Sequence, residues 1–326
     1  MRYLFIFILF IYSNLTAQNA GFSFLNLPVD ANGAGMGGLN IAEKSTNPFG
    51  FLYNPANQSD SLTGYTGFTV MPFFSVGSFS SITTTQKIQG MGNISFGVRH
   101  ISYGTIEGTD PSGNPIGNFK TGESAFHMGK SFSSGNFQAG FSMGFSYSSI
   151  AGYNASAITM DLGSIFIHPD KELVIGLTFK NLGFLISDFS NTAGTQLPFD
   201  IQTGISYKPE HMPVQFNLTI LDLTKNQRSI LDQTDRESGY KKYIRHLNLG
   251  SSFLVSEKIN LNLGYNFSRR NELLLNTIGG GAGWSYGFSF YTSRVEFSYG
   301  HINYIAGKGF NSFSLVTNLN QLLSLK

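Results

Sequence analysis

Residues 137–148 read FQAGFSMGFSYS, and every second residue is apolar while those between are glycine, serine or glutamine. The same alternation recurs in INLNLGYNF at 259–267 and in WSYGFSF at 284–290. Successive side chains of a β-strand point to opposite faces, so a period of two predicts strands with one apolar and one polar face. The pattern continues from about Tyr65 onward, and no segment carries a sustained helical stripe.

About 14 strands are expected from this alternation. Many are long, and a tilted strand of about 9–11 residues is what crosses a bilayer. We therefore predict an all-β fold, a transmembrane antiparallel β-barrel. The expected strands are 64–71, 76–84, 91–102, 121–132, 136–149, 156–167, 172–181, 199–208, 213–223, 243–255, 258–268, 279–290, 293–303 and 310–320.

The connections between these strands alternate in length. Those after even-numbered strands are mostly tight turns, as at Ser133-Ser134-Gly135. Several after odd-numbered strands are long, namely Tyr103–Lys120, Leu182–Pro198, Thr224–Lys242 and Arg269–Ile278. Short turns at one end and long loops at the other are typical of outer-membrane barrels.

The composition supports a membrane-facing surface. Only 12% of the 326 residues are charged, about half the fraction of an average soluble domain. The mean hydropathy of −0.02 is nevertheless neutral. Cysteine is absent, which excludes a disulfide framework, a lipoprotein anchor and a thiolate metal site. The 21 basic and 19 acidic residues are balanced, which argues against nucleic-acid binding.

The first residues read MRYLFIFILFIYSNLTA and predict a secretory signal peptide over 1–17, cut after Ala17. The apolar run from Leu4 to Tyr12 is too short for a helical anchor, which needs about 20 residues. An exported chain of this pattern is expected in the outer membrane of a Gram-negative cell, with the outer-membrane lipids as its surroundings.

Residues 18–63 lack the alternation and are rich in glycine, asparagine and proline. Their apolar content is too high for a free tail, so we expect a plug inside a barrel formed by 64–326. The candidate plug residues are Leu25, Pro28, Gly35, Gly37, Gly38, Asn54 and Pro55.

Inside the barrel we expect glycine, serine and asparagine, with the aromatic residues facing lipid. The charges that fall on inner positions are Arg99, Asp161, Arg294 and Glu296. A weakly charged lumen lined with small polar residues fits a plugged barrel, or one that holds or passes a lipophilic ligand. Gly279-Gly280-Gly281 is a candidate strand kink for a lateral opening.

One expected outer loop concentrates charge. An ordinary solvated loop is the favoured interpretation, and a partner-contacting surface is the alternative. Its candidate contact residues are Arg228, Asp232, Asp235, Arg236, Glu237, Lys241 and Lys242.

No catalytic residues, cofactor site or metal site are predicted. Gly33, Gly35 and Gly38 match a dinucleotide-binding spacing, but the flanking residues predict neither the strand nor the helix that such a site needs. Two matches to G-x-S-x-G, at 140–144 and 283–287, lie inside alternating strands and are wall residues. The histidines have no ligand-like spacing.

Several short motifs resemble the PorV/PorQ proteins of the type IX secretion system. They are Phe24-Leu25-Asn26-Leu27-Pro28, Gly35-Met36-Gly37-Gly38, Tyr53-Asn54-Pro55-Ala56, Lys180-Asn181-Leu182-Gly183 and Leu197-Pro198-Phe199-Asp200-Ile201-Gln202. The opening FLNLP is most similar to the PorQ branch, and the resemblance implies a Bacteroidetes-like cell. The ending Leu325-Lys326 departs from the aromatic terminus of many outer-membrane barrels.

The resemblance implies a barrel related to the FadL fatty-acid transporters, with 14 strands and an N-terminal plug. It also implies a non-enzymatic role in type IX secretion and cell-surface attachment, in a complex with the PorU sortase, PorV and PorZ that links cargo to lipopolysaccharide. The alternative is a FadL-like channel for fatty acids or other hydrophobic substrates. Both roles require the same barrel, whereas a soluble adhesin is disfavoured by the strand lengths and the low charge.

Overall fold

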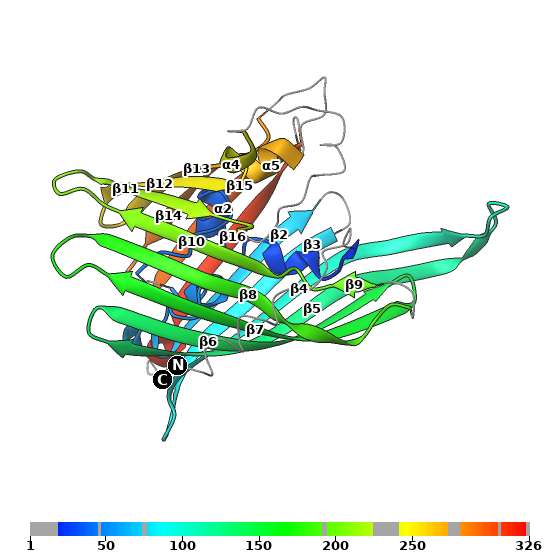
Figure 1. Cartoon of the computed structure of the whole chain (residues 1–326), viewed down its shortest axis with the longest axis horizontal. Coiled ribbons are helices and arrows are strands. Elements are labelled where there is room, and N and C mark those ends of the chain that lie inside the picture. The colour runs from blue at the N-terminus through cyan, green and yellow to red at the C-terminus, as the bar shows by residue number, and fades with distance from the viewer. Residues whose placement is uncertain are drawn as a thin grey trace, which may run out of the picture.

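A computed structural model describes residues 19–44, 47–73, 77–190, 194–223, 241–272, 281–305 and 308–323. Fourteen strands form one closed barrel, in the order β10-β11-β12-β13-β14-β15-β16-β2-β3-β4-β5-β6-β7-β8. Every neighbouring pair with an assigned register is antiparallel, including β16 with β2 and β8 with β10, where the ring closes. The predicted fold class is therefore confirmed (Figure 1).

The barrel strands are longest on the side of β4 to β8 and shortest on the side of β10 to β14. Their bounds are β2 Tyr65–Phe73, β3 Gly77–Ile88, β4 Gly92–Thr109, β5 Pro115–Ser134, β6 Phe137–Ile150, β7 Tyr153–Ile167, β8 Leu173–Ser187, β10 Asp200–Tyr207, β11 Val214–Ile220, β12 Leu247–Ser256, β13 Ile259–Asn266, β14 Trp284–Tyr291, β15 Val295–Ile305 and β16 Lys308–Asn318.

The helices are short. They are α2 Ala31–Gly35, α3 Gly50–Tyr53, α4 Lys241–Ile244, α5 Phe267–Glu272 and α6 Leu319–Leu323, with the 3-10 turns η2 Ser23–Asn26 and η3 Asp60–Leu62. No helix in the described part of the chain is long and apolar enough to cross a membrane.

The two faces of the wall follow the sequence alternation. In β6, Phe141, Met143 and Phe145 are 37%, 51% and 47% exposed, whereas Ser142 and Ser146 are almost fully buried. Large apolar side chains thus form an outer belt, and small polar side chains face the interior, as a bilayer on the outside requires.

One end of the barrel carries tight turns, such as the two residues between β5 and β6. The other end, the long-loop end, carries the connections 188–199, 221–246 and 267–283, each of which includes residues outside the described ranges. The predicted segregation of loop length is present at these three connections.

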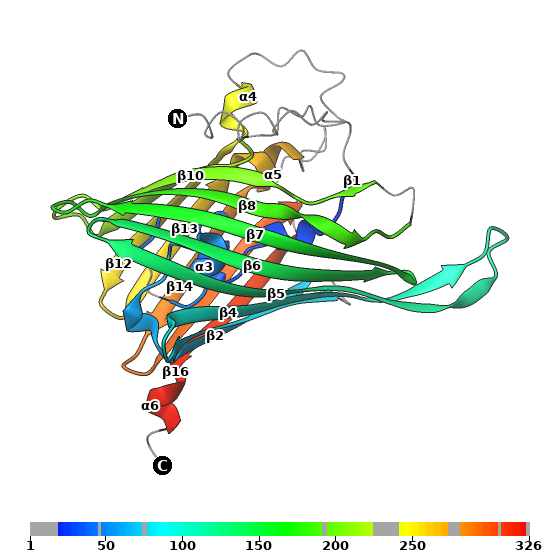
Figure 2. The same cartoon turned by 60° about the horizontal axis from the view of Figure 1, so that its bottom comes forward.

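The prediction of a loop over Tyr103–Lys120 is wrong. β4 and β5 continue through it as a paired hairpin, with Thr105 opposite Lys120, that projects beyond the barrel (Figure 2). Asp110 closes the tip, because its Oδ1 accepts hydrogen bonds of 2.8 Å from the backbone N–H groups of Ser112 and Asn114. The mixed glycine and threonine composition of this hairpin hides its strand pattern.

The N-terminal segment, residues 19–64 and hereafter the plug, enters the lumen. It begins at the long-loop end, where β1 (Asn19–Ala20) pairs with β9 (Thr195–Gln196) in parallel. Its helix α2 packs inside the wall against β13, β14, β15 and β16 (Figure 1). The sequence suggested no helix at the glycine-rich stretch, but the Asp30 side chain caps α2 by accepting from the Gly33 N–H, which makes this single turn possible.

Candidate functional site

A packed apolar cluster lies in the lumen towards the long-loop end. We call the part of the lumen that its wall residues enclose the apolar chamber. Its walls are inward-facing side chains of six strands, all at most 6% exposed: Met71, Phe79, Ile101, Ala125, Ala157 and Phe310. Phe22, Phe24 and Leu25 of the plug fill it and are at most 3% exposed. The expectation of a uniformly small and polar lumen is therefore wrong in this half. The sequence indicates these inward apolar residues only weakly, because a single one such as Phe79 shares a strand face with Ser81 and Thr83.

The plug residues in the chamber are held in a defined conformation. Phe22 has φ of 56°, in the left-handed region that bulky residues rarely occupy. Its carbonyl accepts from the Leu25 N–H at 3.0 Å, closing the turn η2. Packing of the ring in the chamber supports this conformation, which costs on the order of 1–3 kcal/mol.

A buried guanidinium lies beside the chamber. Arg99 is 1% exposed, and its Nη1 donates to the Leu25 carbonyl at 2.8 Å. Its Nη2 lies 2.7 Å from Nε2 of His127, which is also 1% exposed. Because a guanidinium only donates, His127 Nε2 is the acceptor and the imidazole carries its proton on Nδ1. Arg99 thus connects the wall to the plug backbone.

A second cation does the same further along the plug. The Lys180 ammonium forms an ion pair with Asp161 and donates to the Leu52 carbonyl at 2.9 Å. Asp161 also accepts from the Asn181 N–H at 2.7 Å. The β7–β8 register shifts at this point, and Asn181 has φ of 56°, so a bulge in the wall aims Lys180 and Asp161 at each other.

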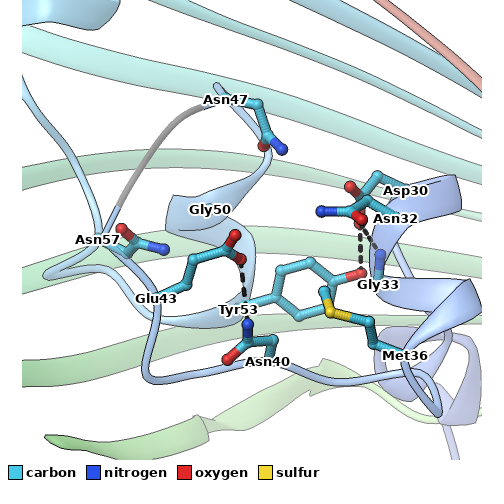
Figure 3. A pocket seen from close by; sticks show the side chains of 10 residues that line it. All are labelled: Asp30, Asn32, Gly33, Met36, Asn40, Glu43, Asn47, Gly50, Tyr53 and Asn57. Carbon is cyan, nitrogen blue, oxygen red and sulfur yellow. Dashed lines mark hydrogen bonds between the residues drawn. The ribbon is translucent and has the colours of Figure 1, made fainter. Parts of the chain in front are cut away.

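Inside the plug, Tyr53 and Asp30 join α3 to α2. The Tyr53 hydroxyl donates to Asp30 Oδ1 at 2.7 Å and accepts from the Val29 N–H at 3.0 Å. Burial raises the pKa of the Asp30 carboxyl above its ordinary value, although the hydrogen bonds that Asp30 accepts from the Tyr53 hydroxyl and the Gly33 N–H oppose the rise. Figure 3 shows Asp30, Tyr53 and Glu43 around one small cavity.

That cavity has a volume of about 10 Å³, enough for about one water molecule. Glu43 lines it and accepts from Asn40 Nδ2 at 3.2 Å. Burial, with repulsion from Asp30 and Glu296, raises the pKa of Glu43 to about 8. Within the described ranges, no group of three or more His, Cys, Asp or Glu side chains could hold a metal ion.

Side chains of the wall from β12 to β14 form hydrogen bonds with backbone atoms of the plug. Ser285 Oγ accepts from the Gly37 N–H at 2.7 Å and donates to the Gly35 carbonyl at 3.1 Å. Asn248 Nδ2 donates to the Met36 and Leu39 carbonyls at 3.2 and 3.0 Å. Serine and asparagine on the inner face thus satisfy the buried backbone of the plug.

Most residues singled out from the sequence lie in or against the plug. Leu25, Pro28, Gly35, Gly37, Gly38, Asn54, Pro55, Arg99 and Asp161 are all buried. Asn54 Nδ2 donates to the Ile41 carbonyl at 2.9 Å. Glu296 is half-buried and accepts from Ser298 Oγ at 3.3 Å.

Arg294 is not a lumen residue. It is exposed in the turn between β14 and β15, because β15 begins at Val295 rather than at 293. Gly281, with φ of 71°, lies in the loop before β14 and is no strand kink, while Gly279 and Gly280 lie outside the described residues.

The charged loop and the signal peptide are not described. Lys241 and Lys242 belong to α4, but their side chains lie outside the described part of the structure. Arg228, Asp232, Asp235, Arg236 and Glu237, together with 1–17, lie outside the described residues. The residues that the sequence reasoning missed are Phe22, Phe24, Asp30, Glu43, Tyr53, His127 and Lys180.

Comparison with solved structures shows the fold. A TodX deltaS2S3 mutant, a monoaromatic hydrocarbon channel, is similar with a TM-score of 0.54 and 11% identity, over 89% of this chain and 98% of that one. The P. putida toluene transporter TodX gives 0.49 and 9%, over 90% and 99%. A Pseudomonas aeruginosa FadL homologue gives 0.46 and 9%, over 89% and 98%.

No protein-family model matches the sequence, and no curated protein is detectably similar to it. The chain shares the overall fold of the TodX deltaS2S3 mutant, and its own barrel is closed by 14 strands. At these identities the likeness concerns the fold alone.

Proposed function

We propose that this chain is a non-enzymatic outer-membrane channel for hydrophobic molecules, gated by its plug. The observation that carries the proposal is the apolar chamber, the largest of the three apolar clusters among the described residues, which Phe22, Phe24 and Leu25 fill. A water-filled pore is lined by polar side chains, whereas Met71, Phe79 and Phe310 are large apolar residues on the inner wall. An apolar lining with a few polar groups at its edge is typical of a site for a small hydrophobic ligand.

Gating follows from what fills the chamber. The apolar side chains of the plug occupy the place that a hydrophobic ligand would take, and the Arg99 bond to the Leu25 carbonyl keeps them there. Withdrawal of η2 would expose the chamber. The hydrocarbon channel activity named for the TodX mutant, which shares the fold, supports this function.

Uptake into vesicles tests the channel. The full chain is reconstituted into phospholipid vesicles, and entry of a radiolabelled monoaromatic hydrocarbon is measured. Phe24→Ala, which removes a ring from the chamber and loosens the plug, should raise the uptake rate. Adding Ala125→Phe to Phe24→Ala puts a ring back into the chamber and should lower the rate again. Ala139→Phe adds the same ring on the outer face of β6 and should leave uptake unchanged. Uptake equal to that of empty vesicles for both wild type and Phe24→Ala would rule out the channel.

The second candidate is a non-conducting component of type IX secretion and surface attachment. It is favoured by the filled lumen, in which the cavity among the plug residues has room for about one water molecule. Its partners, the PorU sortase, PorV, PorZ and lipopolysaccharide, follow from the resemblance in sequence alone. Co-purification with a sortase, and loss of surface display on deletion without a change in hydrocarbon uptake, would favour this role over the channel.

A further inference from the structure

A recess of about 430 Å³ lies on the outer wall between β10 and β14. We call it the belt recess, because it opens towards the lipid within the apolar belt. Its sides are apolar or aromatic, and its floor is made of small or polar residues. The sides are Ile205, Tyr207, Phe216, Leu218, Leu249, Leu263, Tyr265 and Trp284, and the floor is Asn217, Gly250, Ser251 and Gly264.

The recess exists because one outward position is small. Ser251 pairs with Phe216 on one side and with Leu263 on the other, so a serine stands between two large side chains in the same row. Next to it, Gly250 pairs directly with Gly264. The wall here consists of little more than backbone.

The plug closes the inner side of this thin wall. A Cβ on Gly264 would lie 2.2 Å from the Gly37 nitrogen, and one on Gly250 would lie 3.2 Å from the Met36 carbonyl oxygen. Asn217 Nδ2 lies 3.6 Å from the Met36 sulfur. The belt recess and the plug are therefore separated by a single layer of backbone.

We propose that the belt recess binds one acyl chain of a membrane phospholipid. It is continuous with the lipid-facing belt, and an unfilled recess forfeits the dispersion contacts that a hydrocarbon chain would make with its sides. Ser251 Oγ donates to the Leu263 carbonyl at 3.4 Å, so the hydroxyl on the floor is already paired within the wall. Tyr207, Tyr265 and Trp284 are residues typical of the ends of such a belt.

The lining chemistry selects this occupant over two others. The lining of the recess contains no lysine, arginine or histidine, so it offers no opposite charge to the phosphates of lipid A. A second copy of the chain would have to insert a ridge of its outer face into the recess. The large outward residues of β10 to β14 line the recess itself and so do not form such a ridge. Lipid A and self-association are therefore outcomes that count against the proposal.

Trp284 makes the site directly observable. It is the single tryptophan of the chain and is 47% exposed on the side of the recess. The full-length protein in neutral detergent is titrated with phosphatidylethanolamine brominated on an acyl chain, and quenching of tryptophan fluorescence is recorded. The proposal expects saturable quenching, with about one lipid bound per chain.

Filling the recess should displace the lipid. Ser251→Phe should weaken binding by about tenfold, the equivalent of excluding about two methylene groups. Ser251→Leu, a smaller change, keeps the test valid if the phenylalanine variant fails to assemble, and Ala139→Phe on β6 is the matched control. Quenching that does not saturate, that is unchanged in both Ser251 variants, or that occurs only with brominated lipid A would overturn the proposal, as would dimerisation lost in Ser251→Leu.

Discussion

Arg99, a residue of the wall, donates a hydrogen bond of 2.8 Å to the carbonyl of Leu25, a residue of the plug. The contact joins positions 74 residues apart in the sequence and lies where the apolar chamber meets polar lumen. Lys180 repeats the arrangement at the Leu52 carbonyl. Arg99 and Lys180 therefore each join a side chain of the wall, His127 or Asp161, to a backbone carbonyl of the plug. The wall thus holds the plug at two separate places.

Loss of the Arg99 contact should loosen the start of the plug. Arg99→Met keeps much of the side-chain volume but removes the donor, and a hydrogen bond from a charged group contributes about 1.5–3 kcal/mol. We expect faster proteolysis within residues 21–27 of the purified protein while the barrel still migrates as folded before heating. Arg294→Met, in the exposed turn before β15, is the matched control and should change neither property. Equal protection in both variants would show that Arg99 does not anchor the plug.

Docking of the plug should weaken as the pH rises. The pKa of Glu43 is raised from 4.5 to about 8, so the docked plug binds this proton more tightly than an undocked one does. The contribution of Glu43 to docking is therefore complete below pH 4.5, declines between pH 4.5 and about pH 8, and is absent at higher pH. Asp30, Glu296 and Tyr53 are the titratable groups nearby, and the raised pKa of Asp30 acts in the same direction.

Hydrogen exchange of residues 30–53, corrected for the intrinsic rate, measures this effect. Exchange should be faster at pH 9 than at pH 6 in the wild type. The difference should be smaller in Glu43→Gln, which cannot ionise at this position and keeps only the contribution of Asp30. A Glu43→Gln variant that kept the full pH dependence would assign the effect to another group.

A charge on the outer face should impair barrel assembly. Phe141 points outward from β6, opposite Lys130 of β5. A charge on the lipid face costs about 2–4 kcal/mol at mid-membrane for basic residues, and less for acidic residues and nearer the interfaces. Phe141→Asp should reduce the amount of heat-modifiable barrel, whereas Ser133→Asp, exposed at the tight turn, should not. Normal amounts of folded Phe141→Asp would mean that this part of β6 does not face lipid.

Alternation in the sequence predicts the barrel well because the bilayer imposes it on every strand. The run from Phe137 to Ser148 needs no information beyond its own residues, since lipid lies on one side and the polar lumen on the other. The same rule fails for β4 and β5 beyond Tyr103, where the hairpin leaves the membrane and both of its faces meet water.

The site is less predictable because it depends on pairs that are distant in the sequence. The contact of Lys180 with Asp161 requires the bulge at Asn181, and the alternation alone does not indicate a residue with positive φ in a strand. Arg99 could be placed on the inner face by counting, but its partner is a backbone carbonyl, which no residue type reveals.

The pairing of Gly264 with the plug gives a graded prediction about close packing. A Cβ at Gly264 would lie 2.2 Å from the Gly37 nitrogen and 2.3 Å from the Met36 carbonyl carbon, and neither backbone atom can rotate away. A Cβ at the paired Gly250 would lie 3.2 Å from the Met36 carbonyl oxygen and 3.3 Å from the Met36 Cβ, and small shifts can relieve these contacts. Overpacking of this kind typically costs about 1–3 kcal/mol. Gly264→Ala should therefore expose the plug to protease far more than Gly250→Ala, with both barrels folded. If the two variants were equally protected, the plug would not rest against this part of the wall.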